Sequence, residues 1–234
     1  MKSVLSLFAV FSLVCSTASA IDIAALERAM ANPDRPAADK ERDANRKAPA
    51  VLDFMGLEAG MTALDINASS GWYTEVLSYA VGPNGKVYMQ NRPGGSAEEA
   101  AAAKAARLSN IEQVAAISDA PANSVDFAIT ALNLHDFHNA NPAVAQGILG
   151  QVMGALKPGG ILGVIDHEGT AGSDNATLHR IAFEDAVKAV LQSGFVLLGV
   201  SDILDNEADD HSVGPFDPSL ARNTDRLVLK FMKL

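Results

Sequence analysis

Cysteine is almost absent from this chain: Cys15 is the only one among its 234 residues. A disulfide needs two cysteines, so no bond of this kind can stabilise the fold within one chain. Positive charge is also scarce, because 18 lysines and arginines stand against 28 aspartates and glutamates and leave a formal net charge of −10. Proteins that coat nucleic acid need clustered basic residues to neutralise phosphates, so we expect no nucleic-acid partner.

A long apolar segment is missing as well. The apolar run Val4–Val14 is too short to be a comfortable membrane span. It follows Lys2 and precedes Ala18-Ser19-Ala20, which gives the positive start and the small-residue cleavage site of a secretory signal peptide. We therefore expect residues 1–20 to be removed as a signal peptide. The mature chain would be periplasmic or secreted, with no stable membrane anchor.

Cys15 also raises the question of a lipoprotein signal. Val14 occupies the position before it, where such a signal needs a small residue, so we expect no lipid attachment. Cleavage after Ala20 removes Cys15. The mature chain then has no cysteine, which excludes thiol chemistry.

The rest of the sequence alternates between short apolar runs and helix-forming stretches. Hydrophobic residues make up 48% and charged residues 20% of the chain, which suits one globular domain with a sizeable core. This alternation favours a mostly parallel sheet covered on both faces, and ligands of such sheets bind beyond the carboxyl ends of the strands. We expect strands at Thr62–Ile66, Lys86–Gln90, Ile111–Ala116, Val125–Leu132, Ile161–Ile165, Phe195–Val200 and Leu227–Met232. We expect helices at Ile21–Ala31, Tyr73–Ala80, Ser96–Leu108 (opened by a capping box of Ser96 and Glu99), Pro142–Lys157 and Ala176–Gln192, and a loop at Asn133–Asn141.

Residues 21–60 form a densely charged helical segment before the first main strand. Charged residues recur there at three- and four-residue spacing: Asp39, Arg42, Asp43 and Arg46. This spacing favours ion pairs within a helix. Two interpretations remain open: a solvated helix face, or a lid in which Arg35, Arg42 or Arg46 folds over the ligand edge of the sheet.

The stretch Met61–Glu75 organises the domain at residues 61–234. It predicts a buried strand, a tight turn of small residues at Asn67–Gly71, and the start of a helix. This arrangement lets backbone N–H groups approach a ligand closely. Asp65 lies at the end of the strand, where its side chain can reach a bound small molecule.

Several motifs follow one another in a familiar order: Asp65 before the turn, G-K-V-Y at 85–88, S-V-D-F at 124–127 and L-K-P-G-G at 156–160. In this order they resemble class I S-adenosylmethionine-dependent methyltransferases. More narrowly, SSGWYTEVL, LNLHDFH and NTDRLVLKF are similar to a subfamily of exported, predicted methyltransferases. The resemblance covers residues 32–234. It implies a Rossmann-like α/β fold, with a seven-stranded, mostly parallel sheet whose last strand is antiparallel.

The resemblance also implies a ligand layout, with S-adenosylmethionine as cofactor and a small molecule as methyl acceptor. Asp65 and the turn with Asn67, Ser69 and Gly71 would face the methionine part of the cofactor, within reach of the Tyr73 hydroxyl. Asn91 would face the ribose hydroxyls, Asp119 the adenine amino group, and Asn133 and His135 the methyl group and the acceptor.

The turn departs from the family pattern, which is roughly acid-x-G-x-G-x-G. Here Asn67 and Ser69 fill the first two glycine positions, and Gly71 alone remains. Asparagine tolerates positive φ better than most residues and serine is small, so we expect the turn to keep its shape. The alternative is a binding protein that keeps the fold and has lost the cofactor.

Histidines supply the candidate catalytic chemistry. The five of them are His135, His138, His167, His179 and His211. Several have acidic neighbours and follow strands, so they could converge at one edge of the sheet as a general base or a metal centre. We expect His135, Asp136 or His167 to act as a base where the acceptor must lose a proton. The spacing H-D-x-H is not that of a helical metal motif, so we assign no metal ligands, but a metal-dependent enzyme stays an alternative.

Two smaller expectations concern other polar residues. Ser69 in its strand-to-helix turn resembles a hydrolase nucleophile elbow, with Asp166 and His211 following in the order of a triad. An α/β-hydrolase needs several strands before its elbow, and only helical segments precede Thr62, which disfavours this alternative. At the start of the last strand we expect an ion pair between Asp225 and Arg226.

Overall fold

The computed structural model describes residues 19–234. Residues 1–18 of the expected signal peptide therefore lie outside the described part of the chain. The first described element, β1 (Ser19–Ala20), pairs antiparallel with β2 (Glu58–Ala59). None of the helices within residues 19–234 combines the length and the apolar character needed to cross a membrane.

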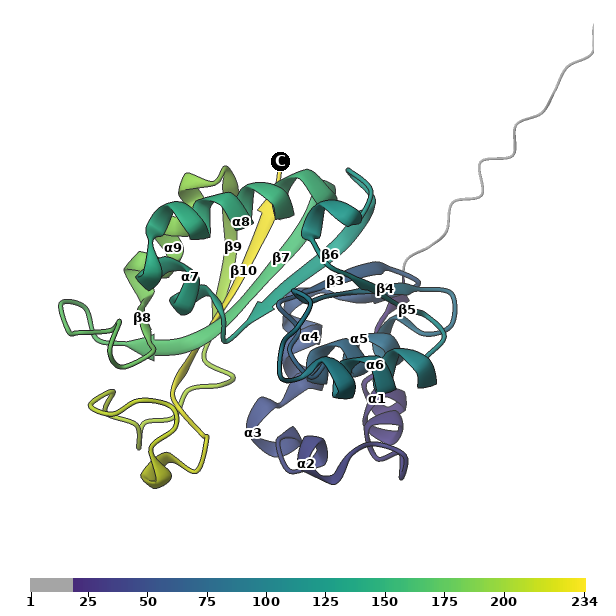
Figure 1. The fold of residues 1–234 in the computed structure, drawn as a ribbon, viewed down its shortest axis with the longest axis horizontal. Helices are drawn as coiled ribbons and strands as arrows, with labels where there is room; N and C mark the ends of the chain where they lie inside the picture. The colour runs from purple at the N-terminus through teal and green to yellow at the C-terminus, as the bar shows by residue number, and fades with distance from the viewer. Residues whose placement is uncertain (1–18) are drawn as a thin grey trace, which may run out of the picture.

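The main sheet follows the order β5-β4-β3-β6-β7-β10-β9 (Figure 1). The pairs β3–β4, β3–β6, β4–β5 and β6–β7 are parallel, whereas β10 runs antiparallel to both of its neighbours. This confirms the predicted seven-stranded sheet with an antiparallel last strand. Its strands are β3 (Thr62–Ile66), β4 (Lys86–Gln90), β5 (Ile111–Val114), β6 (Val125–Ala131), β7 (Leu156–Gly169), β9 (Phe195–Ser201) and β10 (Arg226–Lys233). A two-residue strand, β8 (Ile181–Ala182), pairs with the end of β7.

Helices cover both faces of this sheet (Figure 1). One face carries α7 (Leu134–Ala140), α8 (Pro142–Ala155) and α9 (Phe183–Gln192). The other carries α1 (Ile23–Met30), α4 (Ala48–Met55), α5 (Trp72–Val81) and α6 (Glu98–Arg107). The short elements are α2 (Ala37–Lys40), α3 (Asp43–Arg46), η1 (Ile117–Asp119) and η2 (Pro218–Leu220).

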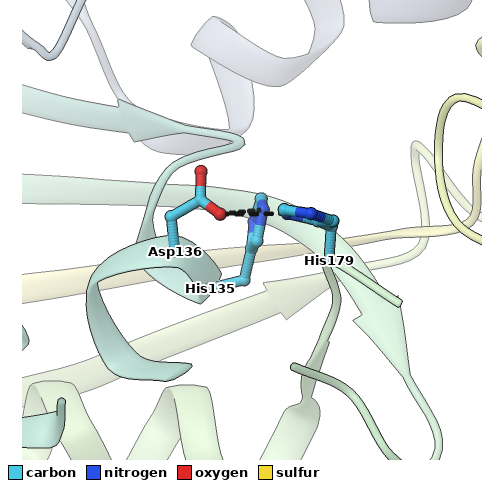
Figure 2. Close-up of side chains that lie close together, drawn as sticks. All are labelled: His135, Asp136 and His179. Carbon is cyan, nitrogen blue, oxygen red and sulfur yellow. Dashed lines mark hydrogen bonds and ion pairs between the residues drawn. The ribbon is translucent and has the colours of Figure 1, made fainter. Parts of the chain in front are cut away.

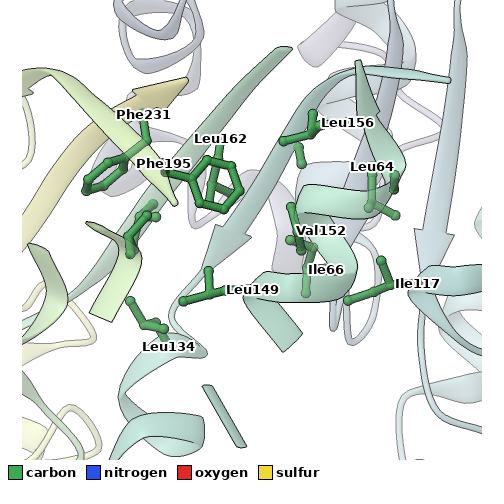
Figure 3. Packing of buried hydrophobic residues seen from close by; sticks show 14 of the residues in the cluster. Leu64, Ile66, Ile117, Leu134, Leu149, Val152, Leu156, Leu162, Phe195 and Phe231 are labelled. Atoms are coloured by element: carbon green, nitrogen blue, oxygen red, sulfur yellow. The ribbon is translucent and has the colours of Figure 1, made fainter. Parts of the chain in front are cut away.

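Side chains of a strand alternate between the two faces of the sheet, so β3 contributes to the core on each face. In β3, Leu64 packs into the core under α8, with Leu149 and Val152 (Figure 3). Its neighbour Ala63 packs into the opposite core, which contains Leu52 of α4. The segment before β3 thus shares a core with the sheet, and this fixes its position over the strand ends.

Some predicted boundaries are wrong. The expected capping box is absent: α6 begins at Glu98, and its N-cap, Ala97, accepts no side-chain hydrogen bond. The expected loop Asn133–Asn141 contains α7, because Leu134 and Phe137 pack into the core. The last long helix begins at Phe183, seven residues later than expected at Ala176, since the preceding residues form turns and β8.

The ion pairs predicted within a helix of the charged N-terminal segment, at three- and four-residue spacing, are also wrong. Its acids pair with more distant partners: Asp43 with Arg35 at 2.6 Å and Asp39 with Lys104 of α6 at 2.7 Å. The indole Nε1 of Trp72 donates to the Asp39 carbonyl at 2.9 Å. These bonds attach the segment to α5 and α6, so it lies along the ligand edge rather than as a solvated helix.

Candidate functional site

The turn after β3 holds three residues in the left-handed backbone region. The angle φ is +50° at Asn67, +54° at Ser69 and +76° at Gly71. These are the three positions that the family pattern fills with glycine, so the expectation that the turn keeps its shape is confirmed. A Cβ at Gly71 would lie 2.9 Å from the Met89 sulfur, so that position needs glycine for space as well.

Two side chains from the end of β4 brace this turn. The Asn91 Oδ1 accepts from the Ser69 N–H at 2.8 Å, and its Nδ2 donates to the Ser69 carbonyl at 2.9 Å. The Gln90 Oε1 accepts from the Asn67 N–H at 3.0 Å, while its Nε2 donates to the Ala115 carbonyl at 3.0 Å. Asn91 thus takes over the support of a turn that has lost two glycines, and Gln90 is a supporting residue that the sequence did not reveal.

A cavity of about 540 Å³, here called the first cavity, opens beside the turn. Three of the predicted cofactor residues line it: Asn67, Ser69 and Asn91. The rest of its wall comes from the loop after β4 and the end of β5, including Arg92, Gly94, Glu98 and Gln113. A smaller cavity of about 380 Å³ shares Asn67 and Arg92 with it and reaches Ile117, Phe137 and Ile148.

Neither of these cavities is lined by the other predicted cofactor residues, which are Asp65, Gly71, Tyr73, Asp119 and Asn133. Asp65 is 2% exposed and accepts from the Thr74 hydroxyl at 2.6 Å. Burial raises its pKa from 3.8 to about 6, although the Thr74 hydrogen bonds oppose the shift. Tyr73 is buried with its ring edge-on to Trp72 at 4.8 Å. Asp119 accepts from the backbone N–H groups of its own loop, at Ala115 and Ala116.

Asn133 connects the turn to α7. Its Oδ1 accepts from the Asn67 Nδ2 at 2.8 Å, and its Nδ2 donates to the Ala131 carbonyl at 2.9 Å. The helix that begins after Asn133 carries His135 and Asp136. A side-chain bond therefore joins the wall of the first cavity to the helix that lines a second one.

This second cavity, of about 530 Å³, contains all three predicted catalytic residues: His135, Asp136 and His167. Its wall comes from four separate parts of the chain: the N-terminal segment, α7, the end of β7 with the loop after it, and the long excursion before β10. The other charged or aromatic side chains in its wall are Glu41, Arg42, Arg46, His179, Phe216, Arg222 and Arg226. The alternative that Arg42 and Arg46 fold over the ligand edge agrees with this wall, whereas Arg35 is buried against Asp43 and Glu75.

His135 and Asp166 form a buried dyad. The His135 Nδ1 lies 2.6 Å from the Asp166 Oδ1, and the His135 backbone N–H donates to the Asp166 Oδ2 at 2.8 Å. Burial lowers the pKa of His135, but the hydrogen bond and the charge of Asp166 outweigh it and raise the pKa above the ordinary value. Because Nδ1 is held by Asp166, Nε2 is the ring atom left for proton transfer.

One carboxylate oxygen of Asp136 approaches a nitrogen of two imidazole rings, those of His135 and His179 (Figure 2). The Asp136 Oδ1 is 3.2 Å from the His135 Nε2 and 3.1 Å from the His179 Nδ1. One ligand atom from each residue lies within 4.8 Å of the others, which is the size of a metal centre. Four arginines line the same cavity, however, and their charge opposes a bound cation. The electrostatics therefore favours Asp136 as a polar neighbour of the two rings over a shared metal ligand.

His167 is poorly suited to accept a proton. Burial, followed by the charges of His135 and Arg226, holds its pKa far below the ordinary value. Its Nδ1 lies 2.6 Å from the Thr224 hydroxyl, which also accepts from the Arg226 Nε at 3.2 Å. His167 is therefore a neutral hydrogen-bonding group of the cavity wall.

The remaining expectations concern the hydrolase triad, the ion pair at the start of the last strand, and His138. The hydrolase triad is not assembled, because Asp166 holds His135 and His211 instead contacts Asp225 at 3.0 Å. The expected ion pair of Asp225 with Arg226 is wrong: the Arg226 guanidinium donates to Thr224 and to backbone carbonyls. His138 is not part of the second cavity.

No protein-family model and no curated protein matches this chain. Solved structures do. A SAM-dependent methyltransferase from Aquifex aeolicus aligns with a TM-score of 0.62 and 21% identity, over 91% of this chain and 99% of that one. The [4+2]-cyclase SpnF aligns with a TM-score of 0.61 and 21% identity, over 86% of this chain and 84% of that one. The fibrillarin of Aeropyrum pernix, solved with natively bound S-adenosyl-L-methionine, gives 0.54 and 16%, over 81% and 76% of the two chains.

These identities are low, so the comparison establishes the fold alone. One of the matching structures is a cyclase, which shows that this fold does not determine the reaction. The reaction therefore has to be argued from the residues. The strand order, the antiparallel β10 and the turn after β3 agree with it. The chain therefore has the Rossmann-like fold of the class I methyltransferases.

Proposed function

We propose that this protein is an S-adenosylmethionine-dependent methyltransferase that acts on a small molecule. One observation carries the proposal: Asn67, Ser69 and Gly71 keep positive φ at the three glycine positions of the turn, beside a cavity of about 540 Å³. Asparagine adopts positive φ more readily than most residues and serine is small, so both positions can present the backbone of the turn to the cavity as glycine would.

The residues around the first cavity fit the cofactor. Asn67, Ser69 and Asn91 form its wall, and Gly71 allows the chain to approach closely at the start of α5. The smaller cavity beside it has the apolar side chains Ile117, Phe137 and Ile148, which suit a flat base. S-adenosylmethionine, when bound, supplies an activated methyl group.

The second cavity suits the acceptor. Its volume of about 530 Å³ is in the range of small-molecule sites. Transfer of a methyl group requires chiefly that the acceptor be positioned in line, and a base is needed only if the acceptor loses a proton. His135 would take that proton at Nε2, while Asp166 orients its ring through Nδ1.

We also propose that the mature protein works outside the cytoplasm. The support is the sequence pattern of Lys2, the apolar run Val4–Val14 and the cleavage site before Ile21. N-terminal sequencing of protein recovered from the periplasm or the medium tests it. A mature chain that begins at Ile21 is the expected result, and an unprocessed chain in the cytoplasm contradicts it.

Calorimetric titration with S-adenosylmethionine and S-adenosylhomocysteine tests the main proposal. We expect saturable binding of both at one site. No binding at millimolar ligand contradicts it. If the parent chain fails to bind and the double variant Asn67→Gly, Ser69→Gly binds, the chain is instead a methyltransferase fold that has lost its cofactor.

A further inference from the structure

Arg46 lines the second cavity with its guanidinium free of protein acceptors. Its CZ atom lies 4.5 Å from the Trp72 ring centroid and 5.4 Å from that of Tyr73. Within residues 19–234 it has no side-chain hydrogen bond and no ion pair. A guanidinium carries five N–H donors, so the contacts with the two rings can hold Arg46 in place without occupying any of these donors.

Arg226 is a second cavity arginine without an acidic partner. It is 3% exposed, and burial is the main cause that lowers its pKa. Its three hydrogen bonds go to neutral oxygens: the Thr224 hydroxyl at 3.2 Å and the Asn45 and Arg222 carbonyls at 2.7 Å each. These bonds hold the side chain in place and leave two N–H donors unused.

The other buried basic side chains of the described chain are treated differently. Arg35 contacts the carboxylates of Asp43 and Glu75, Lys104 contacts Asp39, and Arg180 donates to both oxygens of Asp209. A buried charge without a partner costs several kcal/mol, which explains these pairs. Arg46 and Arg226 both line one cavity, and neither forms an ion pair there within residues 19–234. The acids whose charges act on Arg46 are Asp65, which contacts Thr74, and Asp39, which contacts Lys104. Those that act on Arg226 are Asp209, which contacts Arg180, and Asp225, which contacts His211.

His167 adds a neutral polar group to the same wall. Its Nδ1 lies 2.6 Å from the Thr224 hydroxyl, which accepts from the Arg226 Nε at 3.2 Å. A neutral imidazole has one N–H donor and one acceptor nitrogen, so the His167 Nε2 can hydrogen-bond a ligand group in either tautomer.

We propose that the second cavity binds an anionic group, a carboxylate or a phosphate, between Arg46 and Arg226, and that the methyl acceptor carries this group. Planar guanidinium groups bind such oxygens with strong, directional hydrogen bonds. The exposed Arg42 and Arg222 lie at the same cavity. Its four arginines outnumber its two acids, Glu41 and Asp136, so the cavity attracts an anion even though the chain has a net charge of −10. The identity of the acceptor rests on the proposed function, whereas the anion site does not.

A carboxylate in this cavity has two sources, the acceptor or the amino-acid part of the cofactor. Inorganic phosphate, titrated into the protein at constant ionic strength with and without saturating S-adenosylhomocysteine, separates them. We expect phosphate to bind at one site in both cases. Arg46→Gln should weaken this binding by about tenfold or more, and Arg46→Lys, which keeps the charge, should weaken it less.

The control variant is Arg28→Gln, an exposed arginine of α1 outside the cavity, which should bind phosphate like the parent. Three results overturn the proposal: no phosphate binding, unchanged binding in Arg46→Gln, or competition between phosphate and S-adenosylhomocysteine. In the last case Arg46→Gln should also weaken S-adenosylhomocysteine but spare 5′-methylthioadenosine, which lacks the carboxylate. Phosphate binding without any S-adenosylhomocysteine binding would refute the methyltransferase proposal and keep the anion site.

Discussion

The two main cavities have nearly the same volume, about 540 and 530 Å³, but their walls are built in opposite ways. The first is lined by a turn, by segments that follow neighbouring parallel strands and by the start of α6, mostly with short side chains such as Ser69 and Asn91 and with one charge of each sign, Arg92 and Glu98. The second is lined by four arginines and three histidines from distant parts of the chain. Backbone shape defines the first cavity, and side-chain charge defines the second.

Behind the wall of each cavity lies a buried carboxylate, and the two carboxylates differ in their hydrogen-bond partners. Asp166, at the second cavity, faces the imidazole of His135 and accepts from three N–H groups. Asp65, beneath the turn of the first, has one neutral hydroxyl as its close partner. The Asp166 carboxylate is therefore matched by several N–H donors, whereas Asp65 has few partners and burial raises its pKa.

The largest expected effect follows from removing the carboxylate at the second cavity. Asp166→Ala leaves three buried N–H groups, two on His135 and one on His167, without their acceptor. Losing one partner of such a buried pair costs about 3–5 kcal/mol of unfolding free energy. The pKa of His135 should fall as well, because burial lowers it once Asp166 is absent. Urea denaturation and histidine NMR titration measure the two effects.

Asp136→Ala is the matched control, because the Asp136 side chain is 55% exposed at the same histidine. It should change the unfolding free energy by less than about 1 kcal/mol. Equal losses in the two variants would show that burial of Asp166 does not distinguish the two acids.

The next effect concerns Asp65 and is visible in the dependence of stability on pH. Its folded pKa of about 6 lies above the ordinary 3.8, so between these values the folded chain holds a proton that the unfolded chain has released. The resulting stabilisation is complete below about pH 4 and is lost as the pH rises to about 6, in total about 3 kcal/mol. Asp65→Asn cannot titrate, so its stability relative to the parent should rise across this window.

The comparison is made by urea denaturation of parent and variant at several pH values. The diagnostic quantity is the change with pH in the difference between the two unfolding free energies. Any effect of the substitution apart from titration is the same at every pH and cancels. Parallel curves between pH 4 and 6 would place the pKa of Asp65 near its ordinary value and remove the contrast with Asp166.

The fold could be predicted largely from the sequence, because apolar strands such as Val125–Leu132 are continuous and are bounded by turn residues. The structure ends that strand at Ala131, one residue earlier. The helix α7 could not be predicted, since Leu134–Ala140 is rich in Asn, Asp and His, which favour helices weakly. Packing of Leu134 and Phe137 against the core decides its conformation, and single-sequence patterns do not contain that information.

The residues of the two cavities also differ in how far the sequence alone could predict them. Asn67 and Ser69 could be found because they lie in the turn after a predicted strand, and Asn91 because it ends the next strand, where the resemblance places a ribose contact. Arg226 could not, because its contact with the Asn45 carbonyl joins residues 181 positions apart. The sequence suggested an ion pair with its neighbour Asp225, and only the tertiary structure shows that the guanidinium turns away toward the second cavity.

Backbone shape at the first cavity is tested by Gly71→Ala. An added Cβ would lie 2.9 Å from the Met89 sulfur and 3.3 Å from the Lys104 Cδ, at a φ of +76°. Strain and crowding together should lower the unfolding free energy by about 2–3 kcal/mol and weaken S-adenosylhomocysteine binding. Gly60→Ala has a φ of +84° and open space, so it should cost about 1 kcal/mol and leave binding unchanged. Equal effects on binding would contradict a role for the turn.

The smallest effect distinguishes two roles of Asn91. If its amide chiefly supports the turn through Ser69, as the distances of 2.8 and 2.9 Å indicate, Asn91→Ala should lower the unfolding free energy by about 1 kcal/mol. It should also weaken S-adenosylhomocysteine binding severalfold, while phosphate binding at the second cavity stays unchanged. Asn91→Asp keeps the acceptor for the Ser69 N–H and loses the donor to the Ser69 carbonyl. Its unfolding free energy should therefore lie between those of the parent and of Asn91→Ala. If Asn91→Asp instead binds S-adenosylhomocysteine more tightly than the parent, the side chain faces the ribose as a ligand, and the first cavity depends on side-chain recognition after all.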